Sequence, residues 1–275
     1  MNLLVRPWLS VVLLSVLFFL PSSAFAGLSP EEVKGFEGFR TLAEKGDRVG
    51  QYNLGDCYFV GYGVAKDAVV AARWYRKAAD QGFAMAQYNL GVFYANGYGV
   101  EQDLAEAVKW YRKAADQGNA FAQSRLGNYY YGEGVPKDAV EAVKWYRKAA
   151  DQGNAEAQTK LGLCYDSGLG VTKDEVEGVK WYRKAAEQGD TQAQRYLGQA
   201  YEMGEGVAKD DIEAYAYFNL SGITNEEART RRVLFEKKLS PEAVLRGQQR
   251  TKELQKEIDA KIAAKKAEDL KKAVK

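Results

Sequence analysis

Apolar residues recur along this chain as paired helical stripes, which are separated by short glycine-containing segments. Within residues 83–118, Ala86, Leu90 and Tyr94 repeat at i, i+4 and i+8, which places them on one face of a helix. A second stripe follows in the same segment and contains Ala107, Trp110, Tyr111, Ala114 and Ala115. Because glycines lie between the two stripes and permit a tight turn, the pattern predicts a helix, a turn and a second helix.

The second stripe belongs to a run, Trp-Tyr-Arg-Lys-Ala-Ala, that the chain repeats. The run begins at Trp74, Trp110, Trp145 and Trp181, and the helix it predicts ends each time on a glycine, at Gly82, Gly118, Gly153 and Gly189. These glycines are 36, 35 and 36 residues apart, and a fixed period of this size is typical of a solenoid. We expect five units, the last of them degenerate, at residues 47–82, 83–118, 119–153, 154–189 and 190–225.

Local signals predict where the helices begin and end. Asp103 suits the N-cap of a second helix, and Glu106 three residues later completes the pattern of a capping box. Gly118 follows the last helical residue, where a left-handed backbone favours glycine. Another glycine lies on the buried face of each first helix, namely Gly55, Gly91, Gly127, Gly162 and Gly198. Such a glycine costs about 1 kcal/mol relative to alanine, so we expect the Trp or Tyr of the second helix to pack closely against it.

The motifs Leu-Gly-x-x-Tyr (Leu90, Gly91 and Tyr94), Gly-x-Gly-Val and Ala-x-x-Trp-Tyr-Arg-Lys-Ala-Ala resemble those of the Sel-one-like repeat (SLR) family, a variant of the tetratricopeptide repeat. The resemblance extends over residues 47–225. It implies an all-α fold, a right-handed superhelical solenoid of antiparallel helix pairs, and a role as a protein-binding scaffold. Period and stripes alone predict a helical solenoid, but neither its handedness nor its role.

The segments outside the repeats differ from them in pattern. Residues 1–26 combine an apolar core with an Ala-Phe-Ala cleavage site before Gly27, which is typical of a signal peptide. We therefore expect a periplasmic protein, or alternatively a secreted one, that has no transmembrane span after signal removal. Residues 27–46 align with a second helix and predict an N-terminal capping helix. Residues 226–275 predict two further helices and a charged tail.

Composition narrows the possible chemistry. The chain has no histidine, which removes the usual base of Ser-His-Asp and Cys-His enzymes and the commonest metal ligand. Residues 27–275 also lack a Ser-x-x-Lys motif, so a β-lactamase-like hydrolase is disfavoured. We expect no enzymatic activity, no cofactor and no metal site. A net charge of +2 on an exported chain argues against a nucleic-acid partner.

The two cysteines, Cys57 and Cys164, occupy the same slot of units that are three apart. If each unit advances the stack by about one helix diameter, ~10 Å, their separation is on the order of 25–30 Å. A disulfide requires Cα atoms within about 7 Å, so we expect no disulfide within one chain. A bridge between two chains is the alternative.

Two columns on the first helices vary between units, and in tetratricopeptide-like superhelices this helix lines the concave groove. One column contains Tyr52, Tyr88, Ser124, Thr159 and Arg195, and the next contains Asn53, Asn89, Arg125, Lys160 and Tyr196. Variable polar and aromatic residues suit a peptide-binding groove, although drift on an unconstrained surface gives the same pattern. A ladder of arginines, by contrast, repeats unchanged at Arg76, Arg112, Arg147 and Arg183. We expect this ladder to be a solvated face, neutralised by the carboxylate four residues after each arginine, with contact to an anionic glycan or lipid as the alternative.

Together, these patterns predict an exported, non-enzymatic repeat scaffold that acts as an adaptor or regulator of an envelope process. Its partner would be another envelope or secreted protein, or a peptide. A module that binds glycan or peptidoglycan is the alternative. The groove distinguishes the two, because clustered aromatic residues favour a glycan, whereas mixed charges favour a peptide.

Overall fold

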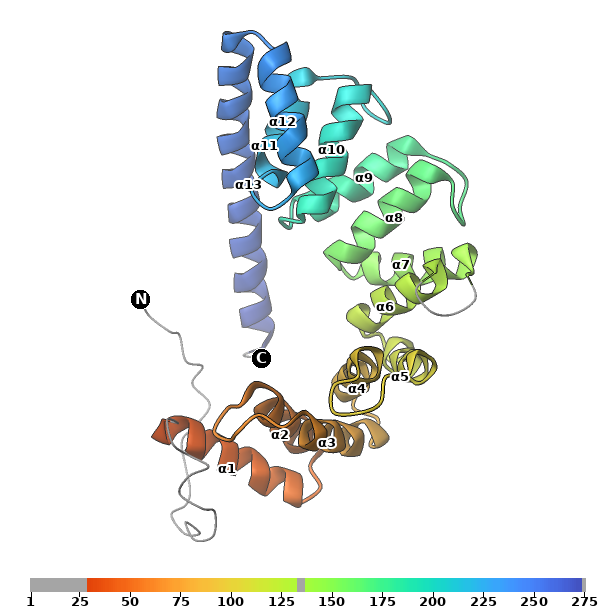
Figure 1. Cartoon of the computed structure of the whole chain (residues 1–275), viewed down its shortest axis with the longest axis vertical. Helices are drawn as coiled ribbons and strands as arrows, with labels where there is room; N and C mark the ends of the chain where they lie inside the picture. The colour runs from red at the N-terminus through yellow and green to blue at the C-terminus, as the bar shows by residue number, and fades with distance from the viewer. Residues whose placement is uncertain (1–28, 133–136, 274–275) are drawn as a thin grey trace.

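The computed structural model describes residues 29–132 and 137–273, and every regular element in these two ranges is an α-helix. The helices follow one another along an arc, with α1 at one end and α11 to α13 at the other (Figure 1). Their bounds are α1 Pro30–Glu44, α2 Arg48–Val60, α3 Ala68–Asp80, α4 Ala84–Asn96, α5 Leu104–Asp116, α6 Ala120–Tyr131, α7 Ala139–Asp151, α8 Ala155–Ser167, α9 Glu175–Ala186, α10 Thr191–Met203, α11 Asp211–Ser221, α12 Glu226–Lys238 and α13 Pro241–Ala273. The predicted all-α solenoid is confirmed, while the predicted signal peptide at residues 1–26 lies outside the described residues.

Each unit pairs a first helix with the second helix that follows it. The first helices are α2, α4, α6, α8 and α10, and the second helices are α3, α5, α7, α9 and α11. α1 precedes these pairs and packs on unit 1, where its Phe36 and Ala43 are buried together with Leu54 and Cys57 of α2. The half-buried Trp74 of α3 packs against the same cluster. α1 therefore occupies the place that a second helix occupies in the following units.

The second helices begin at the predicted N-caps, but their capping boxes are incomplete. Asp103 accepts a hydrogen bond from the backbone N–H of Glu106 at 2.9 Å, and the equivalent aspartates do the same in the other units. The side chain of Glu106 accepts its hydrogen bond from Nε1 of Trp110 at 2.9 Å instead of from the backbone of Asp103. In units 2 and 3 the expectation of a full box was wrong because the buried indole N–H needs an acceptor, and the glutamate one turn earlier supplies it.

A tyrosine, and not a tryptophan, covers the glycine on the first helices of units 1 to 4. A Cβ built on Gly91 would lie 2.7 Å from the ring of Tyr111, closer than side chains pack. The other pairs are Gly55 with Tyr75, Gly127 with Tyr146, Gly162 with Tyr182 and, in unit 5, Gly198 with Phe218. Trp110 is instead buried against Ala78 and Ala79 of the preceding second helix. The tyrosine thus holds one unit together, whereas the tryptophan joins it to the unit before.

The second glycine of the Gly-x-Gly turn lies against the preceding unit. Gly99 has a φ of 62°, and a Cβ there would lie 2.3 Å from the backbone of Ala68 at the start of the preceding second helix. Gly170 and Gly206 meet the preceding unit in the same way. Backbone approaches backbone at these points, which only glycine allows.

A glutamine on each first helix links the unit to its neighbour. Nε2 of Gln87 donates to the carbonyl oxygen of Ala79, in the last turn of the preceding second helix, at 3.1 Å. Oε1 of Gln87 accepts from Nε2 of Gln117, at the end of its own unit, at 2.7 Å. Equivalent glutamine pairs are Gln51 with Gln81, Gln123 with Gln152 and Gln158 with Gln188. Because these first-helix amides are buried, both of their polar atoms need partners, and the links satisfy them.

α12 and α13 close the C-terminal end of the solenoid. Leu254 and Ile258 of α13 are buried in one cluster with Tyr217 and Leu220 of α11. Leu220 occupies a slot that carries lysine in the other units, and α13 is what covers it. Beyond this cluster α13 runs along the open side of the arc, and its end points toward the N-terminal units (Figure 1). Among the described helices, none combines the length and the apolar character needed to cross a bilayer.

Candidate functional site

The aromatic members of the first predicted column lie between neighbouring first helices. The ring centroid of Tyr52 is 5.3 Å from that of Phe83, which is the N-cap residue of α4. The ring centroid of Tyr88 is 6.0 Å from that of Phe121 in α6. Both tyrosines are half-buried, so they take part in the joint between units and present only part of each ring to a ligand.

The polar members of the same column are also used in joints. Oγ1 of Thr159 donates to the carboxylate of Asp190, the N-cap residue of α10, at 3.1 Å. Arg195 forms an ion pair of 3.1 Å with Glu227 of α12, and only 10% of its side chain is exposed. Ser124 is buried as well. The structure therefore buries or half-buries this column in every unit, and four of its five members contact a residue of the following unit or of α12.

The second column is more open. Arg125 lies 3.8 Å from Glu156 of the next first helix, and Tyr196 stacks on Tyr182 with centroids 5.1 Å apart. The other members are half-buried, namely Asn53, Asn89 and Lys160. In the described part of the chain Lys160 forms no ion pair, so it is the member of this column whose charge is available to a partner.

An exposed apolar stripe, formed by Val49, Met85 and Phe121, crosses the first turns of α2, α4 and α6. Their exposed fractions are 46%, 39% and 57%. The three residues occupy one slot, which carries Glu156 in unit 4 and Gln192 in unit 5. Neither predicted column includes this slot. The signal that could have revealed it is in the sequence, because the residue two before the repeated glutamine changes from apolar to polar after unit 3.

The arginine ladder differs from the solvated face that its sequence pattern predicted. Arg112 donates a hydrogen bond to the hydroxyl of Tyr130, and its guanidinium carbon lies 4.9 Å from the ring centroid of Trp145. Both rings belong to the following unit, and Arg76 repeats the arrangement one unit earlier. Among the described residues, none of the ladder arginines pairs with the carboxylate four residues later. The planar guanidinium stacks on the indole, so the ladder is a further joint between units.

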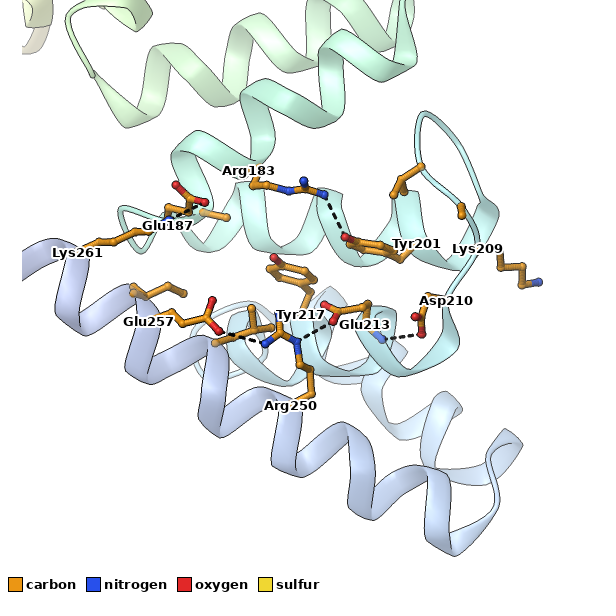
Figure 2. Close-up of a pocket in the computed structure, with 15 residues that line it drawn as sticks. Arg183, Glu187, Tyr201, Lys209, Asp210, Glu213, Tyr217, Arg250, Glu257 and Lys261 are labelled. Atoms are coloured by element: carbon orange, nitrogen blue, oxygen red, sulfur yellow. Dashed lines mark hydrogen bonds and ion pairs between the residues drawn. The ribbon is translucent and has the colours of Figure 1, made fainter.

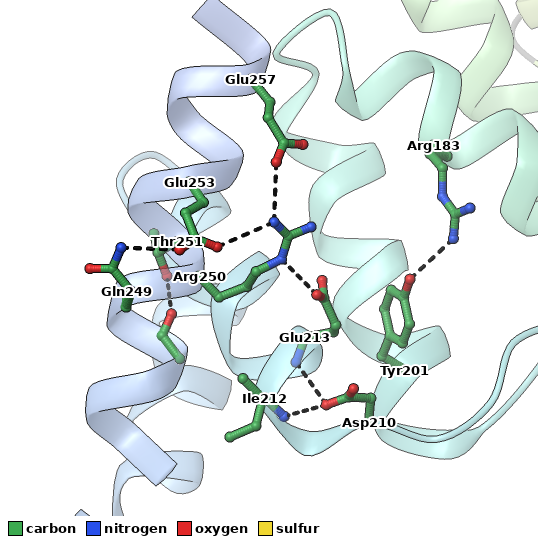
Figure 3. Close-up of polar contacts among 11 residues, drawn as sticks. Arg183, Tyr201, Asp210, Ile212, Glu213, Gln249, Arg250, Thr251, Glu253 and Glu257 are labelled. Carbon is green, nitrogen blue, oxygen red and sulfur yellow. Dashed lines mark hydrogen bonds and ion pairs between the residues drawn. The ribbon is translucent and has the colours of Figure 1, made fainter. Parts of the chain in front are cut away.

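α13 and the last two units enclose a cavity of about 460 Å³ (Figure 2). Arg250 of α13 points into it and pairs with Glu213 at 2.7 Å and with Glu257 at 3.2 Å (Figure 3). On the other side Arg183 donates to the hydroxyl of Tyr201 at 3.1 Å. Because its arginines are engaged by neighbouring side chains, the cavity is explained by the way α13 docks and does not require a ligand.

The sequence profile of the Sel1 repeat matches this chain at residues 49–83, 84–119, 120–154, 155–190 and 191–222. The chain belongs to the Sel1 repeat family. Among solved structures it is similar to a Sel1 repeat protein from Oxalobacter formigenes, with 38% identity and a TM-score of 0.70 over 74% of this chain and 81% of that one. It is also similar to a protective antigen with an SLR fold from uropathogenic Escherichia coli, with 31% identity and a TM-score of 0.57 over 86% of this chain and 59% of that one. Comparison with curated proteins gives no match.

The Sel1 repeat family is generally a non-catalytic scaffold, and neither the family match nor the similar solved structures indicate a catalytic family. Within the described residues, no group of three or more Cys, Asp or Glu side chains is arranged to hold a metal ion. Cys57 and Cys164 are free and buried. Burial raises the pKa of both thiols to about 11, which keeps them protonated and unreactive near neutral pH.

Proposed function

We propose that this Sel1 repeat protein is an exported scaffold that binds another protein of the cell envelope through the first helices of units 1 to 3. The observation that carries the proposal is the apolar stripe. Large apolar side chains are exposed in the same slot of three successive first helices, and exposed apolar residues that gather on one face mark interaction sites. Units 4 and 5 build the same helix pair with Glu156 and Gln192 in the slot, so the fold itself does not require an apolar residue there.

Export is supported by the signal-peptide pattern of residues 1–26. The similar Escherichia coli protein is described as a protective antigen, which is in keeping with a location outside the cytoplasm. Fractionation of cells that produce the full chain tests this part of the proposal. We expect the protein in the periplasm or medium, with an N-terminus near Gly27 by mass spectrometry. An intact N-terminus in the cytoplasm would refute export.

The binding role is tested by capturing partners from envelope extract with the mature chain. A Met85→Glu/Phe121→Glu variant places two carboxylates in the stripe, and we expect it to retain at least about 10-fold less partner. Val140→Glu/Val176→Glu is the matched control, because both valines are comparably exposed but lie on second helices. Circular dichroism must first show unchanged helix content in both variants. Equal retention by the two variants would remove the stripe from the site, and failure of the mature chain to retain any partner would refute the scaffold role.

A glycan-binding role is the second candidate, and a separate aromatic cluster favours it. Phe59 near the end of α2 and Tyr98 in the loop after α4 are exposed, with ring centroids 5.7 Å apart, and both pack on the buried Phe93. Co-sedimentation of the mature chain with purified peptidoglycan tests this candidate. Under this candidate we expect binding that Tyr98→Ala weakens and the stripe variant does not. The absence of co-sedimentation would eliminate the candidate.

A further inference from the structure

α13 shows which side chains the end of a second helix can bind. The segment Glu187-Gln188-Gly189, which follows α9, is contacted by two successive turns of α13. Lys261 pairs with the glutamate at 2.8 Å, and Lys265 donates to Oε1 of the glutamine at 2.7 Å. Cδ1 of Ile262 lies 3.6 Å from the position of a Cβ on the glycine. We call such an acidic-Gln-Gly segment a stop socket; this one holds an aliphatic side chain between two lysines.

Units 1 to 3 carry the same stop socket. The segments are Asp80-Gln81-Gly82, Asp116-Gln117-Gly118 and Asp151-Gln152-Gly153. Their glycines have φ values of 79°, 87° and 83°, close to the 85° of Gly189, so the socket glycine takes the same left-handed backbone in all four units. At Gly82 and Gly118 no described residue lies within 4 Å of the Cβ position, whereas at Gly153 the ammonium of Lys265 is 3.7 Å away. α13 therefore occupies the socket of unit 4, touches that of unit 3 and leaves the first two open.

The glutamine links orient the open sockets for a cation. Nε2 of Gln117 donates inward to Gln87, just as Nε2 of Gln188 donates to Gln158. This fixes the amide so that Oε1 remains as the acceptor, and in unit 4 that acceptor binds Lys265. Asp116, next to Gln117, is exposed and forms no ion pair in the described ranges. Each open socket thus offers a carboxylate and a carbonyl oxygen side by side.

The apolar stripe borders the open sockets. Met85 follows Gly82 by three residues, and Phe121 follows Gly118 by three residues. At the socket that α13 occupies, Gln192 is the equivalent residue. The sockets that α13 contacts, in units 4 and 3, are therefore preceded along the solenoid by sockets with apolar neighbours, and the end of α13 points toward the N-terminal units (Figure 1).

We propose that the sockets of units 1 and 2 and the apolar stripe form one docking site for an amphipathic helix of a partner protein. That helix has the chemistry of α13, with aliphatic side chains one turn apart and lysines beside them. Its aliphatic side chains cover Met85 and Phe121, and its lysines pair with Asp80 and Asp116. A helix fits better than an extended peptide, because Lys261, Ile262 and Lys265 reach one socket together only at helical spacing. The inference rests on the proposed function and adds the class of segment that binds.

A labelled synthetic peptide with the sequence of residues 250–271 serves as the probe, because it carries this chemistry. Fluorescence anisotropy measures its binding to the full mature chain. We expect saturable binding, weakened at least about 10-fold by Asp80→Lys/Asp116→Lys and by Met85→Glu/Phe121→Glu. Val140→Glu/Val176→Glu should leave it unchanged, and a peptide with Glu at positions 261 and 265 should not bind. Absence of binding, or equal weakening by the control variant, would overturn the inference.

Displacement of the chain's own α13 is the competing explanation for peptide binding. In that case Glu187→Lys would weaken binding and Asp80→Lys/Asp116→Lys would not, which would also overturn the inference. The result separates the two proposals. If the mature chain retains an envelope partner that the stripe variant loses, yet the peptide does not bind, the protein-binding role stands and the lysine-bearing helix is wrong.

Discussion

The N-terminal and C-terminal parts of this solenoid use the same unit but finish it differently. In every unit an aromatic ring of the second helix covers the glycine of the first, and a buried first-helix glutamine donates to an alanine carbonyl oxygen of the preceding helix. In units 4 and 5, α13 covers the ends of the second helices, and the first-turn slot is polar. In units 1 to 3 the slot is apolar and exposed. Within the unit, the positions that hold the fold are therefore separate from the exposed first-turn slot, so the slot can change while the packing positions stay fixed.

The largest expected effect comes from removing a joint between two units of the N-terminal part. Trp145 of unit 3 is buried against Ala114 and Ala115 of unit 2 and lies beneath the guanidinium of Arg112. We expect Trp145→Ala to reduce the free energy of unfolding by about 3–5 kcal/mol, because it leaves a cavity between units. Trp74→Ala should cost less, since Trp74 is only half-buried against α1. Urea denaturation of both variants measures the difference, and equal losses would contradict the assignment of the tryptophan to the inter-unit joint.

A smaller effect should follow from loosening α13 without changing its polar contacts. A Cβ on Gly247 would lie 2.4 Å from the ring of Tyr215 in α11. Gly247→Ala should therefore destabilise the chain by about 1–3 kcal/mol, although alanine is the better helix former. Gly38→Ala in α1 is the control, because no residue of the described ranges lies within 4 Å of its Cβ position, and it should be neutral or stabilising. Thermal unfolding followed by circular dichroism measures both changes. A stable Gly247→Ala variant would show that α13 adjusts freely on α11.

The cysteines allow the two parts to be probed separately. Burial raises the pKa of both thiols to about 11, so folding favours the protonated form. The stability that this contributes is complete below the ordinary thiol pKa near 9 and is lost as the pH rises toward 11. We expect slow alkylation of the folded chain at pH 8, and two labels per chain after unfolding without reductant. In mild urea Cys57, which packs beneath α1, should react before Cys164. The reverse order would show that α13 does not steady the C-terminal units.

The smallest effect concerns the lysine in the occupied stop socket. Lys261 and Glu187 are 52% and 42% exposed, so their ion pair is screened by solvent. Lys261→Ala should change the free energy of unfolding by less than about 1 kcal/mol. A double-mutant cycle with Glu187→Ala measures the pair itself, and a coupling well above this value would mean that the socket holds α13 by charge more than by Ile262.

The sequence predicted the elements of the fold because helix pairs are encoded by local patterns. Stripes, N-cap aspartates and terminal glycines lie within one unit, and each has a local physical cause. Contacts between units were predicted poorly, because residues such as Arg112 and Tyr130 meet only after the units stack. The sequence pattern therefore predicted an ion pair between each ladder arginine and a carboxylate on its own helix. In the structure Arg112 instead contacts aromatic rings of the next unit. The apolar stripe could have been recognised by comparing the copies, whereas the stop socket could not, since only α13 shows what it holds.

The glutamine link has a consequence for the length of this chain. Gln87 donates to the carbonyl oxygen of Ala79, and Gln123 donates to that of Ala115, so successive units offer each other identical groups. Excision of residues 84–119 would bring Gln123 to Ala79, which presents the same acceptor, and a thermal melt of the shortened chain would test whether it still folds. A gene that encodes such units can gain or lose whole copies by recombination, because the new neighbours still present matching hydrogen-bond donors and acceptors to each other. The number of units is then open to selection by the size of whatever the arc has to hold.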